Sequence, residues 1–349
     1  MKVLIEKLKN NKNNIYNKLI FVLEIIASLF LGICIYKVMY LYQDFGYISK
    51  LYVAIAIILI ALLITIFVLN YRKYKDKIEK LFLTFIIPIG MMFVVLLPPN
   101  WTPDEEGHIF KCYDLSMGHI VTPLGENNEG DIYVPRGLYK LTEEKNTFTY
   151  SKIHKLLSEE ADYDDLVPAQ TAAKSYSPVS YIVGGITFAI SRVFNINFLL
   201  ACYIIKLLNF IAFIIVGYVI IKIVPFGKLV FAIYMFLPMC MSQAASISAD
   251  SFINNICLLF IAYNLKLLFQ KQDLKLWQRI IYYIMTILVS LCKYVYFPLV
   301  FLSLLFFGNK EFKKRKVWEL VVVSILLALI CAVCWYVFSR KLCRCKSIY

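Results

Sequence analysis

The sequence predicts an all-α polytopic membrane protein, and its composition is the first observation behind that prediction. Hydrophobic residues make up 60% of the 349 positions and charged residues only 17%, and the mean hydropathy is +0.70. A soluble domain is about a quarter charged. A chain this apolar cannot hide its hydrophobic side chains in one core, because a domain of this size still leaves about a quarter of the surface of its unfolded chain in contact with solvent. Lipid must therefore solvate much of it.

The charge pattern is the second observation. The formal net charge is +14, which in a soluble protein would suggest nucleic acid as a partner. Here the Lys and Arg residues lie mainly in short stretches between apolar runs, which is typical of the cytoplasmic flanks of membrane helices. The pattern therefore argues against nucleic acid and for a lipid bilayer as the partner.

Three apolar runs near the N-terminus are long enough to cross a bilayer: Leu19–Tyr42, Ile48–Leu69 and Leu81–Leu97. The segment before the first run and the segment 71–80 are basic, whereas the connector 43–50 is not. The positive-inside rule then places the N-terminus and segment 71–80 in the cytoplasm. The third span would end on the outer face.

A long polar segment without a spanning run follows. Residues 100–177 hold 14 acidic and 7 basic residues, a charge of opposite sign to the rest of the chain. We therefore expect 99–178 to form a large extracytoplasmic loop. It is too long for a plain linker, and 149–160 has the pattern of a short amphipathic helix on the membrane surface.

The remainder predicts a second membrane region. Four apolar segments precede a basic connector at 271–279, and an odd number of crossings is needed between the loop and that connector. We expect the Gly-containing segment 176–194 to lie in the membrane without crossing it. The apolar segments are 176–194, 197–221, 229–244, 252–269, the run 280–307, interpreted as a hairpin of two short helices, and 318–338.

These assignments give about 8–10 membrane segments. The regions are 1–98, a three-span membrane region; 99–178, an acidic loop with surface helices; 179–338, a membrane helical region; and 339–349, a tail. The abrupt basic tail is typical of a truncated chain.

The sharpest motif stands where the third span ends. Thr102, Pro103, Asp104, Glu105 and Glu106 are followed by His108. Carboxylates at a membrane interface could deprotonate an acceptor hydroxyl or hold a divalent cation such as Mg or Mn through hard oxygens. The alternative is structural, because Thr102-x-x-Glu105 with Pro103 forms a capping box. Both interpretations remain open.

Three further residues are candidates. Asp250 lies between two apolar runs beside serines, where it either meets a ligand or caps the following helix. Lys206 and Lys293 lie within apolar runs, where a charge is costly and suggests function. Either lysine could bind a phosphate group or extend its ammonium to the interface. His119 is interpreted as a solvated loop histidine without a role.

The string Thr102–His108, the string Tyr113–Gly118, the turn Ser248–Ser251 and the stretch Lys293–Tyr296 together resemble a family of bacterial polytopic membrane proteins of unknown function. Its members show Pro-Asp-Glu-x-x-His after an early span. The resemblance covers most of the chain, from about residue 20 to 338. The family looks like a relative of the GT-C membrane glycosyltransferases, which implies a GT-C-like fold.

GT-C enzymes pass a sugar from a polyprenyl-phosphate donor to an acceptor outside the cytoplasmic membrane. By resemblance, Asp104 would be the catalytic base, with Glu105 as its neighbour or alternative, and His108 would contact substrate or metal. Lys206 stands where relatives often have Arg. A possible metal set is Asp104, Glu105 and Glu106, and Asp250 and Lys293 would bind substrate.

The resemblance implies a polysaccharide or teichoic-acid-like acceptor in the envelope of a bacterium, with the protein in the cytoplasmic membrane. Two other functions remain open: a flippase or transporter of lipid-linked glycans, and an inactive, truncated member. A transporter should place its charges near the bilayer midplane, whereas the acids here cluster at one predicted face.

Overall fold

The computed structural model describes residues 2–122, 130–143 and 150–344. The chain divides into two compact units. Unit one holds residues 1–98 with 149–152, and unit two holds 99–148 and 153–349. The first boundary falls at the paired prolines that end the third apolar run, where neither residue offers a backbone N–H to continue a helix.

Unit one is a group of three helices: α1 (Lys2–Phe45), α2 (Lys50–Tyr74) and α3 (Ile78–Leu96). Each contains a segment long and apolar enough to cross a membrane, as predicted. Gly46, with a φ of +62° that side chains rarely adopt, ends α1. A small cluster of Ala27, Leu31 and Leu63 is buried between these helices, while many other apolar side chains face outward.

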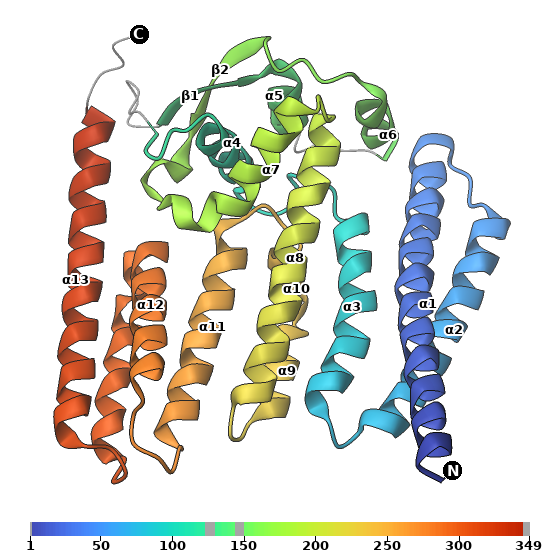
Figure 1. Ribbon diagram of the computed structural model, residues 1–349. Helices are drawn as coiled ribbons and strands as arrows, with labels where there is room; N and C mark the ends of the chain where they lie inside the picture. The colour runs from blue at the N-terminus through green and yellow to red at the C-terminus, as the bar shows by residue number, and fades with distance from the viewer. Residues whose placement is uncertain (1, 123–129, 144–149, 345–349) are drawn as a thin grey trace. The chain divides into compact units, whose positions relative to one another are not determined.

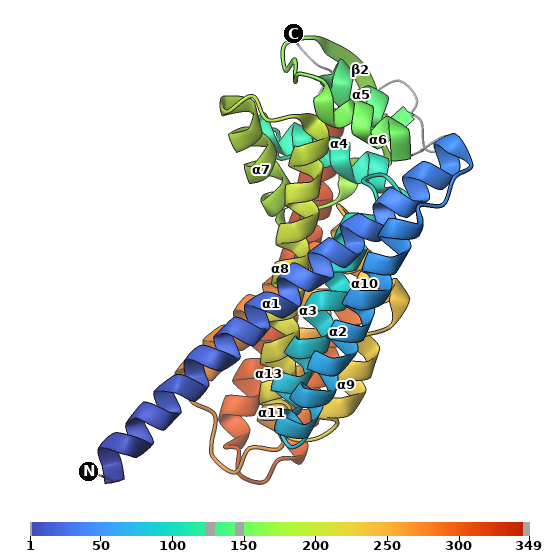
Figure 2. The same ribbon diagram turned by 90° about the vertical axis from the view of Figure 1, so that its right-hand side faces the viewer.

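Unit two contains a bundle of helices that run alongside one another (Figures 1 and 2). The bundle comprises α8 (Phe198–Ile223), α9 (Lys228–Met235), α10 (Pro238–Ala244), α11 (Ala249–Leu268), α12 (Leu276–Cys292), the 3₁₀ helix η3 (Tyr294–Gly308) and α13 (Lys314–Arg344). Among the described residues of both units, six helices are long enough to span a bilayer and three shorter apolar helices accompany them. This confirms a multi-pass membrane protein.

One predicted span is interrupted. The apolar segment 229–244 forms two short helices, α9 and α10, rather than one long helix. Leu237 precedes Pro238 and adopts an extended conformation, with φ −59° and ψ 134°. A residue before proline is driven out of the helical region by the proline ring. Pro238 is visible in the sequence as the cause of this break, but the apolar residues on both sides of it favoured an interpretation as one continuous span.

The predicted hairpin in 280–307 is present as two helices. Helix α12 ends at Cys292 and η3 begins at Tyr294. Lys293 between them is extended, with φ −148° and ψ 132°. A charged, extended residue therefore stands at the turn of two apolar helices.

At one end of the bundle lies a region that we call the cap, residues 99–122, 130–143 and 153–193 (Figures 1 and 2). Its helices are α4 (Glu105–Ser116), α5 (Arg136–Glu143), α7 (Ile182–Val193) and the 3₁₀ turns η1 (Ala172–Ser175) and η2 (Pro178–Tyr181). Helix α6 (Tyr150–Ser158) falls within the predicted surface-helix segment, and its residues from 153 belong to unit two.

The cap also contains two strands, which the all-α prediction lacked. Strands β1 (Gly130–Pro135) and β2 (Leu166–Thr171) pair antiparallel, with Gly130 opposite Thr171. An ion pair between Arg136 and Asp165, with Nε 2.6 Å from Oδ2, closes the other end of the ribbon. The strands are far apart in sequence, so their pairing is a tertiary contact that a local pattern does not contain.

Close packing of α7 on α4 holds the cap together. A Cβ added to Gly184 would lie 2.8 Å from the Cβ of Cys112, and one added to Gly185 would lie 3.0 Å from the Cγ of Leu115. The glycine pair therefore lets the two helices approach closely. The two helices make one of the most extensive contacts in unit two.

We expect Gly184→Ala to destabilise the protein, because the new methyl group meets Cys112 in a fully packed contact. Overpacking of this kind costs roughly 1–3 kcal/mol. The measurement is the thermal unfolding midpoint of the purified protein in detergent. Gly308→Ala is the matched control, since nothing lies within 4 Å of a Cβ added there. Equal midpoints for the two variants would contradict the packing argument.

Candidate functional site

The start of α4 is organised by Glu105. Its Oε2 accepts hydrogen bonds from the backbone N–H of Thr102 at 3.1 Å and from the Thr102 hydroxyl at 2.7 Å. The capping box is therefore half formed, because the threonine hydroxyl donates to the carboxylate instead of accepting from the helix. The helix begins at Glu105 rather than at Pro103.

Glu105 also fastens the cap to the bundle. Its second carboxylate oxygen accepts a 2.7 Å hydrogen bond from the backbone N–H of Ile247, in the turn before α11. Lys206 of α8 interacts electrostatically with the same carboxylate. Both side chains are 1% exposed. Glu105 and Lys206 are therefore buried in this conformation, and their roles toward substrate remain predictions.

Asp104 differs sharply from its neighbour. It is exposed, and its backbone lies in the left-handed region, with φ 60° and ψ 9°. Among side-chain-bearing residues, Asp and Asn tolerate this region best. Strained residues of this kind tend to occur at functional sites, so the conformation adds to the case for Asp104.

His108 lies one turn further along α4, in an aromatic environment. Its Nδ1 is 2.7 Å from the hydroxyl oxygen of Tyr181. The rings of Tyr176 and Tyr181 each lie 5.7 Å from the imidazole, centre to centre. Burial lowers the pKa of His108 to about 4, a lowering that nearby Lys293 reinforces and that Asp250 and Asp104 oppose. The imidazole is therefore neutral at neutral pH.

A cation lies beside this histidine. The ammonium nitrogen of Lys293 is 2.8 Å from Oδ1 of Asp250, and the two side chains are 27% and 33% exposed. The same nitrogen stands 5.0 Å from the centre of the Tyr176 ring. Ser248, not Asp250, caps α11, because its hydroxyl accepts the backbone N–H of Asp250. The carboxylate of Asp250 is therefore left to pair with Lys293.

Four predicted residues thus converge. Asp104, Asp250 and Lys293 all act electrostatically on His108, although they come from the start of α4, the start of α11 and the α12–η3 turn. We call these four residues the interface cluster. Sequence reasoning missed Tyr176 and Tyr181, which carry no motif of their own and are recognisable only through their contacts.

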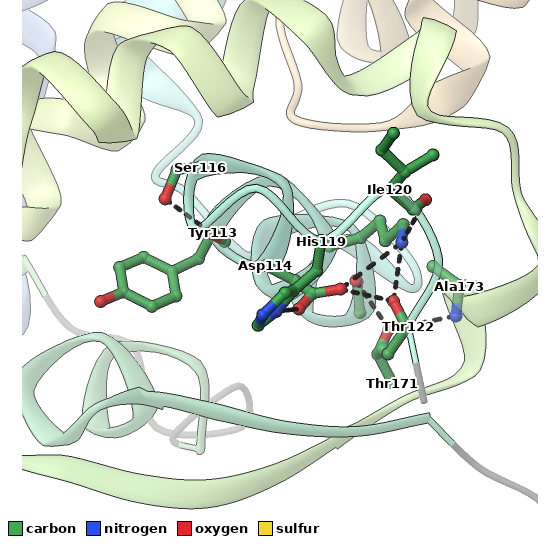
Figure 3. A network of polar contacts seen from close by, with 10 residues as sticks. Tyr113, Asp114, Ser116, His119, Ile120, Thr122, Thr171 and Ala173 are labelled. Atoms are coloured by element: carbon green, nitrogen blue, oxygen red, sulfur yellow. Dashed lines mark hydrogen bonds and ion pairs between the residues drawn. The ribbon is translucent and has the colours of Figure 1, made fainter. Parts of the chain in front are cut away.

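A second polar network stabilises the other end of α4. Asp114 lies between His119 and Thr122 (Figure 3), with His119 Nδ1 at 2.8 Å from Oδ1 and the Thr122 hydroxyl donating to Oδ2 at 2.6 Å. Buried Lys111 donates to the Thr122 hydroxyl at 2.7 Å and lies 3.5 Å from Asp114. His119 is therefore hydrogen-bonded to the helix, although it is the exposed loop residue that the sequence predicts, with its side chain 59% exposed.

Residues 85–348 match the model of a family described as Predicted membrane protein (DUF2142). The chain belongs to this family. The match includes every member of the interface cluster. No curated protein and no solved structure matches the chain significantly.

In this DUF2142 protein, the three acidic residues at the start of α4 do not form one ligand set. Asp104 is exposed, Glu105 is buried against Thr102 and Ile247, and Glu106 lines a separate cavity. Within the described ranges, no group of three His, Cys, Asp or Glu side chains is placed to hold a metal ion. The arrangement is better suited to proton transfer by a carboxylate and charge neutralisation by an ammonium.

The lowered pKa of His108 predicts how stability depends on pH in this DUF2142 protein. The unfolded chain takes up a proton at His108 near pH 6.5, whereas the folded chain does so only near pH 4. Stability should therefore fall as the pH drops from about 6.5 to about 4, by at most about 3 kcal/mol from this group. Thermal unfolding midpoints between pH 7 and pH 4 measure this.

His108→Gln should flatten that dependence, because the amide keeps a polar group beside Tyr181 but takes up no proton. A pH profile of unfolding identical in the parent and the variant would show that His108 is not the group responsible.

Proposed function

We propose that the protein is a membrane glycosyltransferase of the GT-C type, which moves a sugar from a polyprenyl-phosphate donor to a cell-envelope glycan acceptor. The observation that supports it best is the presence of an exposed carboxylate, Asp104, and a partly exposed ammonium, Lys293, that both act electrostatically on His108. Transfer from a lipid phosphate needs those two groups, one for the acceptor and one for the leaving phosphate.

In the proposed reaction, Asp104 accepts the proton of an acceptor hydroxyl. The hydroxyl oxygen forms a bond to the anomeric carbon of the donor sugar. The bond from that carbon to the phosphate oxygen breaks, and its electron pair stays on the phosphate. One displacement inverts the anomeric centre, and Lys293 offsets the charge that develops on the phosphate.

The neighbouring groups have roles that follow from their contacts. Asp250 holds Lys293 at 2.8 Å and shares the cation with the incoming phosphate. The Tyr176 ring lies beside both the neutral imidazole of His108 and the ammonium of Lys293. Low polarity around a charge strengthens its interactions with substrate. The basic cytoplasmic flanks predicted from sequence would put this cluster on the extracytoplasmic side of a bacterial cytoplasmic membrane.

We expect Asp104→Asn to abolish transfer, because an amide cannot accept the hydroxyl proton. A loss of about 10²–10⁴-fold is typical for removal of a general base. The measurement is the sugar composition of envelope glycans from the parent strain, a deletion strain, and the deletion strain complemented with each variant. Asp164→Asn, an exposed cap residue, makes the same chemical change away from the cluster and should restore the glycan.

Complementation by Asp104→Asn at normal expression would exclude Asp104 as the base. A lipid-linked sugar trapped on the cytoplasmic side in the deletion strain would instead favour a flippase.

Lys293→Gln should lower transfer at least about tenfold, because an ammonium that faces developing phosphate charge contributes in the transition state. Lys293→Arg keeps the charge and should retain part of the activity. Lys155→Gln changes an exposed lysine of α6 and serves as the control. Unaltered glycan in the Lys293→Gln strain would remove the lysine from the mechanism.

A further inference from the structure

A cavity in the cap, at the β1–β2 ribbon, shares no lining residue with the interface cluster. It has a volume of about 620 Å³, within the ~300–1,000 Å³ range of small-molecule sites. Its lining comes from α4, the ribbon and α5: Glu106, Phe110, Asp131, Ile132, Tyr133, Tyr139, Pro168, Ala169 and Gln170. Nothing in the proposed reaction uses these side chains.

Helix periodicity puts this cavity behind the reacting face of α4. Glu106 and Phe110 are four residues apart and share one side of the helix, whereas His108, two residues from each, faces away from them. The same short helix therefore carries a member of the interface cluster on one side and two lining residues of the cavity on the other.

The pairing of β1 with β2 places several exposed lining side chains of the cavity on one face of the ribbon. Asp131 stands opposite Gln170, and Tyr133 stands opposite Pro168, so each pair presents its side chains on the same face of the ribbon. The Gln170 amide donates to the Asp131 carboxylate at 3.3 Å. Tyr133 is 66% exposed, so its ring is accessible to a ligand.

Aromatic side chains form part of the lining, together with the apolar side chains of Ile132, Pro168 and Ala169. The rings of Phe110 and Tyr139 stack with an interplanar angle of 3° at 6.2 Å, and Tyr133 adds a third ring. The face of an aromatic ring carries negative potential and attracts the weakly positive C–H bonds on the apolar face of a sugar ring. Carboxylate and amide oxygens beside such rings accept hydrogen bonds from sugar hydroxyls.

The negative charge of the lining favours some glycans over others. Asp131 and Glu106 are acidic, and none of the lining residues in the described part of the chain is basic. A phosphate-bearing polymer would bring its negative charges close to these two carboxylates, which costs free energy at short range. Neutral sugars and amino sugars meet no such penalty.

We propose that this cavity binds a neutral or amino-sugar segment of an envelope glycan and holds the acceptor chain beside α4. Its role as an acceptor site rests on the proposed transferase function, whereas the binding itself does not. The lining also argues against a teichoic-acid-like acceptor, because that polymer carries phosphate along its length.

The test is binding by the purified full-length protein in detergent, without donor lipid. The probes are an array of neutral, amino-sugar and phosphate-bearing oligosaccharides, followed by calorimetric titration of those that bind. We expect saturable binding of neutral or amino-sugar oligosaccharides and none of the phosphate-bearing ones. Tyr133→Ala should weaken binding about fivefold, since it removes an exposed ring and little packing. Tyr47→Ala, an exposed tyrosine of unit one, should leave binding unaltered.

Asp131→Asn provides a second readout, because it removes one negative charge from the exposed face of the ribbon. It should raise the affinity for phosphate-bearing probes relative to neutral ones. Absence of binding across the neutral and amino-sugar probes, or equal affinity in the parent and Tyr133→Ala, would overturn the proposal. Binding that persists while Asp104→Asn still restores the glycan in cells would refute the transferase and leave the glycan site standing.

Discussion

The buried carboxylate of Glu105 is the interaction on which the candidate site depends. One oxygen accepts both donors of Thr102 and the other accepts the Ile247 N–H, while Lys206 supplies a nearby positive charge. A carboxylate taken out of water is stable only when it is hydrogen-bonded and paired in this way. Because Thr102 precedes α4 and Ile247 precedes α11, one side chain sets the position of the cap on the bundle.

That anchor explains the geometry of the interface cluster. With the start of α4 held beside the start of α11, Asp104 and His108 are brought to Asp250, and the Asp250–Lys293 ion pair adds the α12–η3 turn. The cluster therefore needs three separate elements and the buried anchor beneath them. Asp104, Asp250 and Lys293 remain open to solvent, whereas His108 and the anchor are buried.

Helix α4 also organises the cap because other segments of the cap pack around it. Glycines of α7 allow a close approach on one side, and the ribbon and α5 enclose a cavity on another. At its far end, Asp114 gathers His119 and Thr122 (Figure 3). A helix of 12 residues is marginal on its own in water, so these tertiary contacts are what keep it folded.

The sequence by itself determined the membrane helices and indicated several candidate site residues. Apolar runs of spanning length have one stable outcome in lipid, since a helix satisfies its own backbone. Asp104, His108, Asp250 and Lys293 were recognisable because acidic and basic side chains beside or within apolar runs are costly. Predictions of this kind rest on local composition and need no knowledge of the fold.

The tertiary structure decided everything that depends on contacts between distant segments. The β1–β2 ribbon pairs strands far apart in sequence, and Tyr176 and Tyr181 join the cluster only through packing. Glu105 and Asp104 are adjacent and chemically alike, yet one is buried and the other exposed. Burial is a property of what surrounds a side chain, and a local pattern does not specify those surroundings.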